Sequence, residues 1–172
     1  PAWEKIYAED PHRHIFVSWL WLRHWLEITP NNWLVLVVRP DEMSAPVAIL
    51  PLASREFQLL NTYHIRLLYM AGRPFASYTG FVCLPAYEAE SVLALAAYIR
   101  QLPWDRFLLE HVLDARLAQF LNHFSCDQFQ TEPVQQYPSL CISTLQNSWD
   151  AYLQHALGAR TRRNMRRALR QV

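Results

Sequence analysis

Glycine is scarce in this sequence: Gly72, Gly80 and Gly158 are the three glycines among 172 residues. Loops that cradle phosphates need clustered glycines, because only then can several backbone N–H groups converge on the anion. Neither a P-loop nor a G-x-G-x-x-G turn is therefore possible. The sequence also lacks G-x-S-x-G, H-E-x-x-H and C-x-x-C motifs, so it offers no secure nucleophile and no zinc site. No residue is expected to bind a cofactor or a metal.

Cysteine is also rare, and Cys83, Cys126 and Cys141 are odd in number and far apart. A secreted disulfide framework normally has an even set at closer spacing, so we expect three buried free thiols in a reducing cytosol. His12 and His14 have no third ligand nearby. We expect them to be surface histidines.

A membrane-spanning run is missing too. The most apolar stretch, Ile15 to Leu26, is interrupted by Ser18, Arg23 and His24 and is too short to cross a bilayer. The first ten residues carry three acidic side chains and lack the basic-then-apolar start of a signal peptide. The sequence favours a soluble, cytoplasmic protein with no membrane span.

Apolar side chains are plentiful: 52% of residues are hydrophobic, and seven are Trp. This content excludes a disordered chain, and the length suits one domain with a substantial core. Charge is divided unevenly. Residues 1–157 hold ten basic and fifteen acidic residues, a net charge of −5, whereas residues 158–172 hold six arginines and no acid. The two regions are expected to have different partners.

Periodicity in the first half predicts a helix followed by strands. The helix covers Phe16–Ile28, is apolar nearly all round, and should be buried on several sides, with Trp19, Leu22 and Trp25 against a sheet. Alternating and β-rich runs predict three consecutive antiparallel strands. These are Trp33–Val38, Val47–Ala53 and Ile65–Met70.

The second half alternates helices with short strands. The predicted strands are Phe81–Leu84, Phe107–Val112 and Leu140–Ser143. The helix opened by Pro85 has a core stripe of Val92, Leu95, Ala96, Ile99 and Leu102. A helix capped by Asp114 has an inner face of Leu117, Phe120, Leu121 and Phe124, and later helices cover Ser148–Leu157 and Ala159–Val172. This order predicts an α/β (α+β) fold with a mixed, mostly antiparallel sheet flanked by helices.

Several segments resemble the GNAT acyltransferase fold, and in particular the CelD-like and FemAB-like proteins, which carry two GNAT-like domains in tandem. The helix His14–Trp25 looks like their opening helix. Their first hairpin is similar to Trp33–Val38 followed by Val47–Leu52. Trp104–Glu110 resembles the strand after the long helix, and Ser148–Leu153 followed by Arg160–Arg170 resembles the opening of the second domain.

The resemblance implies that residues 1–147 form an N-terminal GNAT-like domain, and that residues 148–172 are helices opening a second, missing GNAT-like domain. It implies a non-catalytic first half of an N-acyltransferase that contributes to the acceptor groove. This chain would hold no cofactor, and the complete protein would use acyl-CoA or aminoacyl-tRNA as donor. The acceptor would be an amine or hydroxyl of a small molecule or cell-envelope precursor.

The loop Gly72–Gly80 is the candidate substrate-facing surface. Arg73 and Tyr78 can fix an anionic or sugar-like group, and Ser77 can add a hydrogen bond. Glu110 ends a predicted strand, where active sites of α/β proteins often lie. The alternative is an ordinary connection with Glu110 facing solvent.

The terminal helix is basic on one face. Arg160, Arg163, Arg167 and Arg170 lie opposite Met165, Ala168, Leu169 and Val172. One interpretation is docking on the missing domain or on a second copy, as a homo-dimer. The other is a stand-alone binding module whose arginines contact RNA or an anionic surface. In either case we expect few contacts with residues 1–147.

Overall fold

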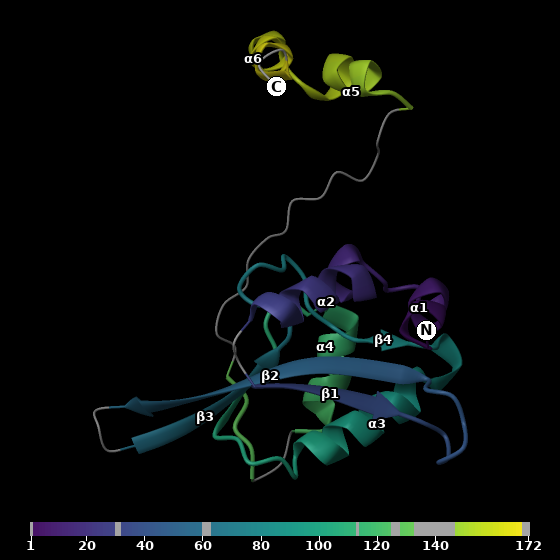
Figure 1. Ribbon diagram of the computed structural model, residues 1–172, viewed down its shortest axis with the longest axis vertical. Coiled ribbons are helices and arrows are strands. Elements are labelled where there is room, and N and C mark those ends of the chain that lie inside the picture. Colours follow the sequence, from purple (N-terminus) through teal and green to yellow (C-terminus); the bar gives the residue numbers. More distant parts are fainter. Residues whose placement is uncertain are drawn as a thin grey trace. The chain divides into compact units, whose positions relative to one another are not determined.

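The computed structural model describes residues 2–29, 32–59, 63–112, 114–124, 128–132 and 147–169. The chain divides into two compact units, Pro1–Glu132 (unit 1) and Pro133–Val172 (unit 2). Figure 1 colours unit 1 from purple to green and the helices of unit 2 yellow. The predicted boundary at residue 147 adjoins residues outside the described ranges, and it stays a prediction.

Unit 1 is built on a five-stranded sheet with the strand order β1–β2–β3–β5, and β4 pairs with β2 outside that path. β1 (Asn32–Val38), β2 (Ala48–Leu59) and β3 (Tyr63–Met70) are consecutive antiparallel strands. β5 (Arg106–Leu108) runs parallel to β3, and β4 (Val82–Cys83) is antiparallel to the start of β2. The predicted mixed, mostly antiparallel sheet is confirmed.

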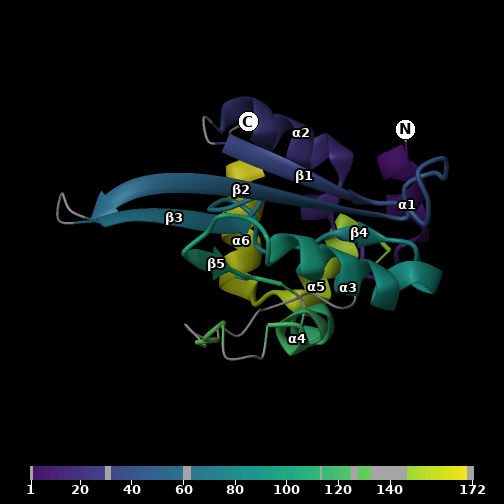
Figure 2. The same cartoon turned by 90° about the horizontal axis from the view of Figure 1, so that it is seen from below.

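The hairpin of β2 and β3 is longer than predicted. β2 continues six residues beyond Ala53 and pairs with β3 out to Leu59. This outer part forms a two-stranded ribbon that projects from the sheet (Figure 2). Residues 55–58 are exposed, and their sequence lacks the apolar alternation that identifies a half-buried strand. The predicted strand therefore ends at Ala53.

Helices cover both faces of the sheet, and each face has its own core. α1 (Ala2–Glu9) and α2 (Trp19–Ile28) lie on one side, and α3 (Glu88–Ile99) lies on the other with α4 (Asp114–Asn122) (Figures 1 and 2). β2 contributes side chains to both cores, because successive side chains along a strand point to opposite faces of the sheet. Leu50 and Leu52 face α3 and α4, whereas Ile49 and Ala53 face α1 and α2.

α2 is buried on one side rather than on several. Ser18 caps it by accepting a hydrogen bond from the Trp21 N–H, and the preceding residues 15–17 form a short 3-10 turn. Leu22 and Trp25 are buried as predicted, and Trp19 is half-buried. Leu20 is 72% exposed, so the expectation of burial on several sides is wrong. A single sheet contacts one face of a helix, and no described element covers the opposite face of α2.

α1 is a helix that the patterns above do not predict. Trp3 and Ile6, one turn apart, are both buried in the core beneath α2. The Trp3 indole Nε1 donates a 2.9 Å hydrogen bond to the Val17 carbonyl. These contacts fix the start of the chain onto the sheet.

α3 carries the predicted stripe. Val92, Leu95, Ala96 and Ile99 are buried, and Leu102, beyond the helix end, packs partly buried against the same core. Pro85 opens a 3-10 turn, Pro85–Tyr87, directly before α3. Phe120 of α4 and Phe124, two residues beyond its end, are buried against the same core, with Leu117 and Leu121 half-buried.

The strand predicted at Phe107–Val112 is shorter in the structure. β5 ends at Leu108, and Val112 makes an isolated parallel bridge with Thr79. Between them His111 has φ 60°, a left-handed conformation that interrupts a strand. The strand predicted at Leu140–Ser143 lies outside the described residues.

The described part of unit 2, residues 147–169, contains two helices. α5 (Trp149–Ala156) is capped by Ser148, whose Oγ accepts a 3.2 Å hydrogen bond from the Ala151 N–H. Gly158 separates it from α6 (Ala159–Leu169), as predicted.

Candidate functional site

A pocket of about 430 Å³ opens on the α2 side of the sheet in unit 1. Its floor comes from three adjacent strands: Arg55 of β2, Leu67 and Tyr69 of β3, and Leu108 of β5. Arg55 stands opposite Leu67, and Tyr69 opposite Leu108, so these residues share one face. The pocket lies at the carboxyl ends of the parallel pair β3 and β5, where α/β sheets commonly bind ligands.

The loop after β3 forms one wall of the pocket. Gly72 has φ +104°, and a Cβ there would lie 3.0 Å from the Ala76 Cβ and 3.2 Å from the Trp21 ring. The tight turn therefore requires glycine. It directs Arg73, Pro74 and Phe75 toward the pocket, and the Trp25 indole donates a 3.0 Å hydrogen bond to the Arg73 carbonyl.

Glu110, two residues after β5, forms the facing wall. Thr79 holds this segment through two bonds: its hydroxyl donates to the Glu110 carbonyl, and its N–H donates to the His111 carbonyl. The left-handed His111 follows immediately. Non-glycine residues in such conformations cluster at binding and active sites, because tertiary contacts must hold them there.

Arg73 and Glu110 meet as an ion pair. The Arg73 Nη2 lies 2.8 Å from the Glu110 Oε2, and their side chains are 31% and 28% exposed. A pair this accessible to solvent contributes only about 0–1 kcal/mol to stability. The contact orients the two side chains toward each other. Because it contributes so little free energy, a ligand can compete for either partner.

The four predicted substrate-binding residues separate into two places. Arg73 and Glu110 line the pocket together. Ser77 is exposed and does not line it, and Tyr78 is half-buried with its ring 5.8 Å from that of His14. Sequence reasoning missed Arg55, a charged residue two positions beyond Ala53 on the same strand face.

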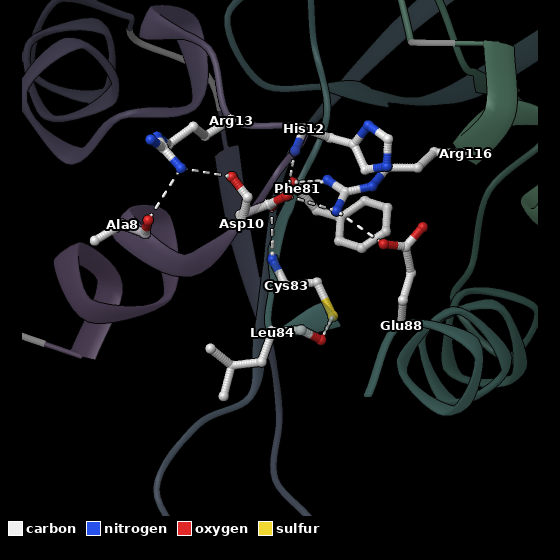
Figure 3. Close-up of polar contacts among 9 residues, drawn as sticks. All are labelled: Ala8, Asp10, His12, Arg13, Phe81, Cys83, Leu84, Glu88 and Arg116. Carbon is white, nitrogen blue, oxygen red and sulfur yellow. Dashed lines mark hydrogen bonds and ion pairs between the residues drawn. The ribbon is translucent and has the colours of Figure 1, made fainter. Parts of the chain in front are cut away.

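A second polar cluster in unit 1 is buried (Figure 3). The Arg116 Nη2 lies 2.9 Å from Asp10 and 3.2 Å from Glu88, and its Nη1 donates a 2.7 Å hydrogen bond to the Phe81 carbonyl. Asp10 also accepts from the backbone N–H of Cys83 at 3.0 Å. Arg116 is 3% exposed and Asp10 0%. The cluster therefore joins the residue after α1 to β4, α3 and α4, and it presents no open surface to a substrate.

His14 lies beside this cluster, so the expectation of a surface histidine is wrong for it, whereas His12 is exposed. Burial, followed by the positive charge of Arg116, lowers the pKa of His14 below its ordinary value. Burial also raises the pKa of the Cys83 thiol, which keeps it protonated and unreactive. Cys83 is a buried free thiol as predicted, and Cys126 and Cys141 lie outside the described residues.

Four of the five described arginines of α6 are exposed. Arg160, Arg163 and Arg167 are exposed, and Arg170 lies outside the described residues. Arg162 is half-buried and donates a 2.9 Å hydrogen bond to the Gln154 carbonyl of α5, and Arg166 lies 3.8 Å from Asp150. Met165 is 39% exposed.

Two searches of the described residues were negative. No group of three His, Cys, Asp or Glu side chains there could hold a metal ion. None of the helices there has the length and apolar character needed to cross a membrane.

A scan against protein-family models, a search of curated proteins and a search of solved structures each find no match to this chain. The GNAT-like resemblance therefore stays a prediction. The candidate site is defined by its geometry: an open pocket at the carboxyl ends of β3 and β5, with Arg73 and Glu110 as its charged walls.

Proposed function

We propose that unit 1 is the acceptor-binding half of a GNAT-like acyltransferase of the tandem kind, with the acyl donor bound by a second GNAT-like domain. The observation that carries the proposal is the pocket with Arg73 and Glu110 at the carboxyl ends of β3 and β5. The antiparallel β1–β2–β3 meander, followed by a crossover through α3 to a parallel β5, supports the same assignment.

The pocket offers the groups that an acyl acceptor needs. In the transfer, the acceptor nitrogen or oxygen forms a bond to the acyl carbon, the bond to the donor's leaving group breaks, and the acceptor gives up a proton. The Glu110 carboxylate is the base in this pocket, and Arg73 can hold an anionic part of the acceptor. Scarcity of glycine argues that the donor's pyrophosphate is bound elsewhere.

The proposal is tested by comparing donor and acceptor probes. Calorimetric titration of the chain with acetyl-CoA should give no binding heat. In ¹⁵N NMR spectra, a set of amino sugars, amino alcohols and amino acids should include members that shift the backbone amides of Leu67, Tyr69 and Leu108. Micromolar binding of acetyl-CoA, or a set in which no member shifts these amides, would overturn the proposal.

A second candidate function belongs to unit 2. Residues 147–169 contain five arginines and one acid, Asp150, and four of the five arginines are exposed. Guanidinium groups spaced along a helix neutralise phosphates and release counterions. We propose that α6 binds RNA, which is measured by fluorescence anisotropy of a labelled single-stranded RNA at several salt concentrations. Binding to anionic lipid vesicles without binding to RNA would assign the helix to a membrane surface instead.

A further inference from the structure

The pocket contains two opposite charges that form an ion pair with each other. Arg73 and Glu110 stand on facing walls, one after β3 and one after β5, with 2.8 Å between the Arg73 Nη2 and the Glu110 Oε2. Around them the lining is mostly apolar, from Ile28, Leu67, Tyr69, Phe75 and Leu108. The pocket thus combines a cation, an anion and an apolar floor within one volume.

We propose that this pocket binds a small ligand carrying both a carboxylate and a protonated amine on an apolar frame, such as a free α-amino acid. The ligand opens the Arg73–Glu110 pair, its carboxylate taking the place of Glu110 and its ammonium the place of Arg73. This inference rests on the proposed function and names the class of acceptor that the site selects.

Charge balance selects such a ligand. A ligand with a carboxylate alone would take Arg73 from Glu110 and leave a partly buried carboxylate without its cation. A ligand with an amine alone would take Glu110 from Arg73 and leave the guanidinium without its anion. Water reaches both side chains in the free pocket, but the apolar frame of a bound ligand would cover the leftover charge and leave it with neither its counterion nor water. A ligand with both charges leaves no group unpaired.

Arg55 determines which way round the ligand binds in the pocket. It lies on the β2 floor on the same face as Leu67, and within the described ranges it makes no ion pair. Arg55 and Arg73 both line the pocket with Glu110 as its one acid. The ligand carboxylate therefore has two guanidinium partners and the ammonium has one carboxylate.

Size and apolar lining fit a compact organic frame. The volume of about 430 Å³ falls within the ~300–1,000 Å³ common for small-molecule sites. Phe75 and Ile28 at the rim are 68% and 70% exposed. Apolar side chains left this open at a pocket gain from covering the hydrocarbon part of a ligand.

Three probes of nearly equal shape test the charge rule on the wild-type chain. L-leucine carries both charges, 4-methylpentanoate lacks only the amine, and 3-methylbutylamine lacks only the carboxylate. NMR titration should show L-leucine shifting the amides of Leu67, Tyr69 and Leu108 with an affinity about tenfold or more above either single-charge probe. Equal binding of all three, or no shift with L-leucine, would overturn the inference.

Two single substitutions in the pocket should change which of the three probes binds best. Glu110→Gln releases Arg73, so 4-methylpentanoate should now bind at least as well as L-leucine. Arg73→Gln releases Glu110, so 3-methylbutylamine should gain affinity. The matched control is the exposed Arg23–Glu27 pair of α2, where Arg23→Gln and Glu27→Gln should leave all three affinities unchanged. Unchanged preferences in the pocket variants would also overturn the inference.

Failure of this inference is separable from failure of the proposed function. If 3-methylbutylamine binds the wild-type pocket as tightly as L-leucine while acetyl-CoA does not bind, the acceptor role stands and the two-charge rule falls. If acetyl-CoA occupies the pocket, the acceptor role falls whatever the leucine probes do.

Discussion

Arg116 of unit 1 and the arginines of α6 in unit 2 lie in opposite environments. In unit 1, Arg116 is 3% exposed and meets Asp10, Glu88 and the Phe81 carbonyl, with its Cζ 4.4 Å from the centre of the Phe81 ring. In unit 2, four of the five described arginines of α6 are exposed. A buried guanidinium with several partners fixes how elements pack, whereas exposed ones contribute little to folding and remain available to a partner.

Arg73 lies between these extremes. It is about one-third exposed, has one carboxylate partner and lines an open pocket. Its partner is close enough to orient it, and solvent reaches it well enough for a ligand to compete. Exposure and the number of partners therefore distinguish three kinds of arginine in this chain. Arg116 is structural, Arg73 is a candidate for ligand binding, and the exposed arginines of α6 form a surface.

The largest effect should come from the buried cluster. Arg116→Met removes the cation from a fully buried Asp10, and breaking a buried pair from one side costs about 3–5 kcal/mol. Urea denaturation should show this loss in the free energy of unfolding. Asp10→Asn together with Arg116→Met should cost less than the sum of the two single changes, because no lone charge remains.

The matched change in unit 2 sharpens the comparison. Arg166→Met removes a partner 3.8 Å from Asp150, and the two side chains are 51% and 81% exposed. Its cost should be at most about 1 kcal/mol. A loss for Arg166→Met as large as that for Arg116→Met would contradict the distinction between buried and exposed arginines.

Sequence patterns predict the sheet well and the buried cluster not at all. β1, β2, β3 and the stripe of α3 follow from short-range periodicity, which the chain expresses locally. Asp10 and Arg116 are 106 residues apart, and each looks like an ordinary surface charge within its own segment. Pairing over such a distance depends on tertiary structure, which periodicity does not encode.

The candidate site was predicted in part for a related reason. Arg73 and Glu110 follow the ends of β3 and β5, and adjacent parallel strands bring such positions to one edge of a sheet. Ser77 and Tyr78 belong to the same loop, but Ser77 is exposed and the Tyr78 ring lies 5.8 Å from that of His14 instead of lining the pocket. Arg55 was missed because the predicted strand stopped at Ala53, before the exposed ribbon.

Charge removal from α6 is expected to weaken RNA binding strongly. Binding to single strands depends on salt with a slope of about −0.7 for each neutralised phosphate, so losing three contacts should reduce the slope by about 2. The variant is Arg160→Gln with Arg163→Gln and Arg167→Gln, measured by anisotropy across a salt series. The same three changes at Arg23, Arg39 and Arg106 of unit 1 should leave the slope unaltered. Equal slopes for both triple variants would break the comparison.

A smaller effect should appear in the pH dependence of unit 1. The pKa of His14 is lowered in the folded chain, so below pH ~6.5 the unfolded chain binds a proton that the folded chain resists. Stability should therefore fall as the pH drops through this window. His14→Gln should flatten the urea-denaturation profile between about pH 7 and pH 5 relative to wild type. His12→Gln, which changes an exposed histidine, is the control and should leave the profile as steep as before.

The smallest effect should follow from removing α6. In the part of the chain that the structure describes, the α6 side chains Arg162 and Arg166 make their hydrogen bond and ion pair with α5, inside unit 2. Exposed pairs of this kind weaken with salt and add little to stability. Deleting residues 158–172 should thus leave the melting temperature of unit 1 nearly unchanged by calorimetry. Deleting residues 1–9 is the counterpart of similar length, and because it removes the buried Trp3 and Ile6 it should lower the melting temperature by many degrees. A fall of several degrees on removing α6 would mean that the basic helix supports unit 1, and its arginines would then no longer count as a surface reserved for a partner.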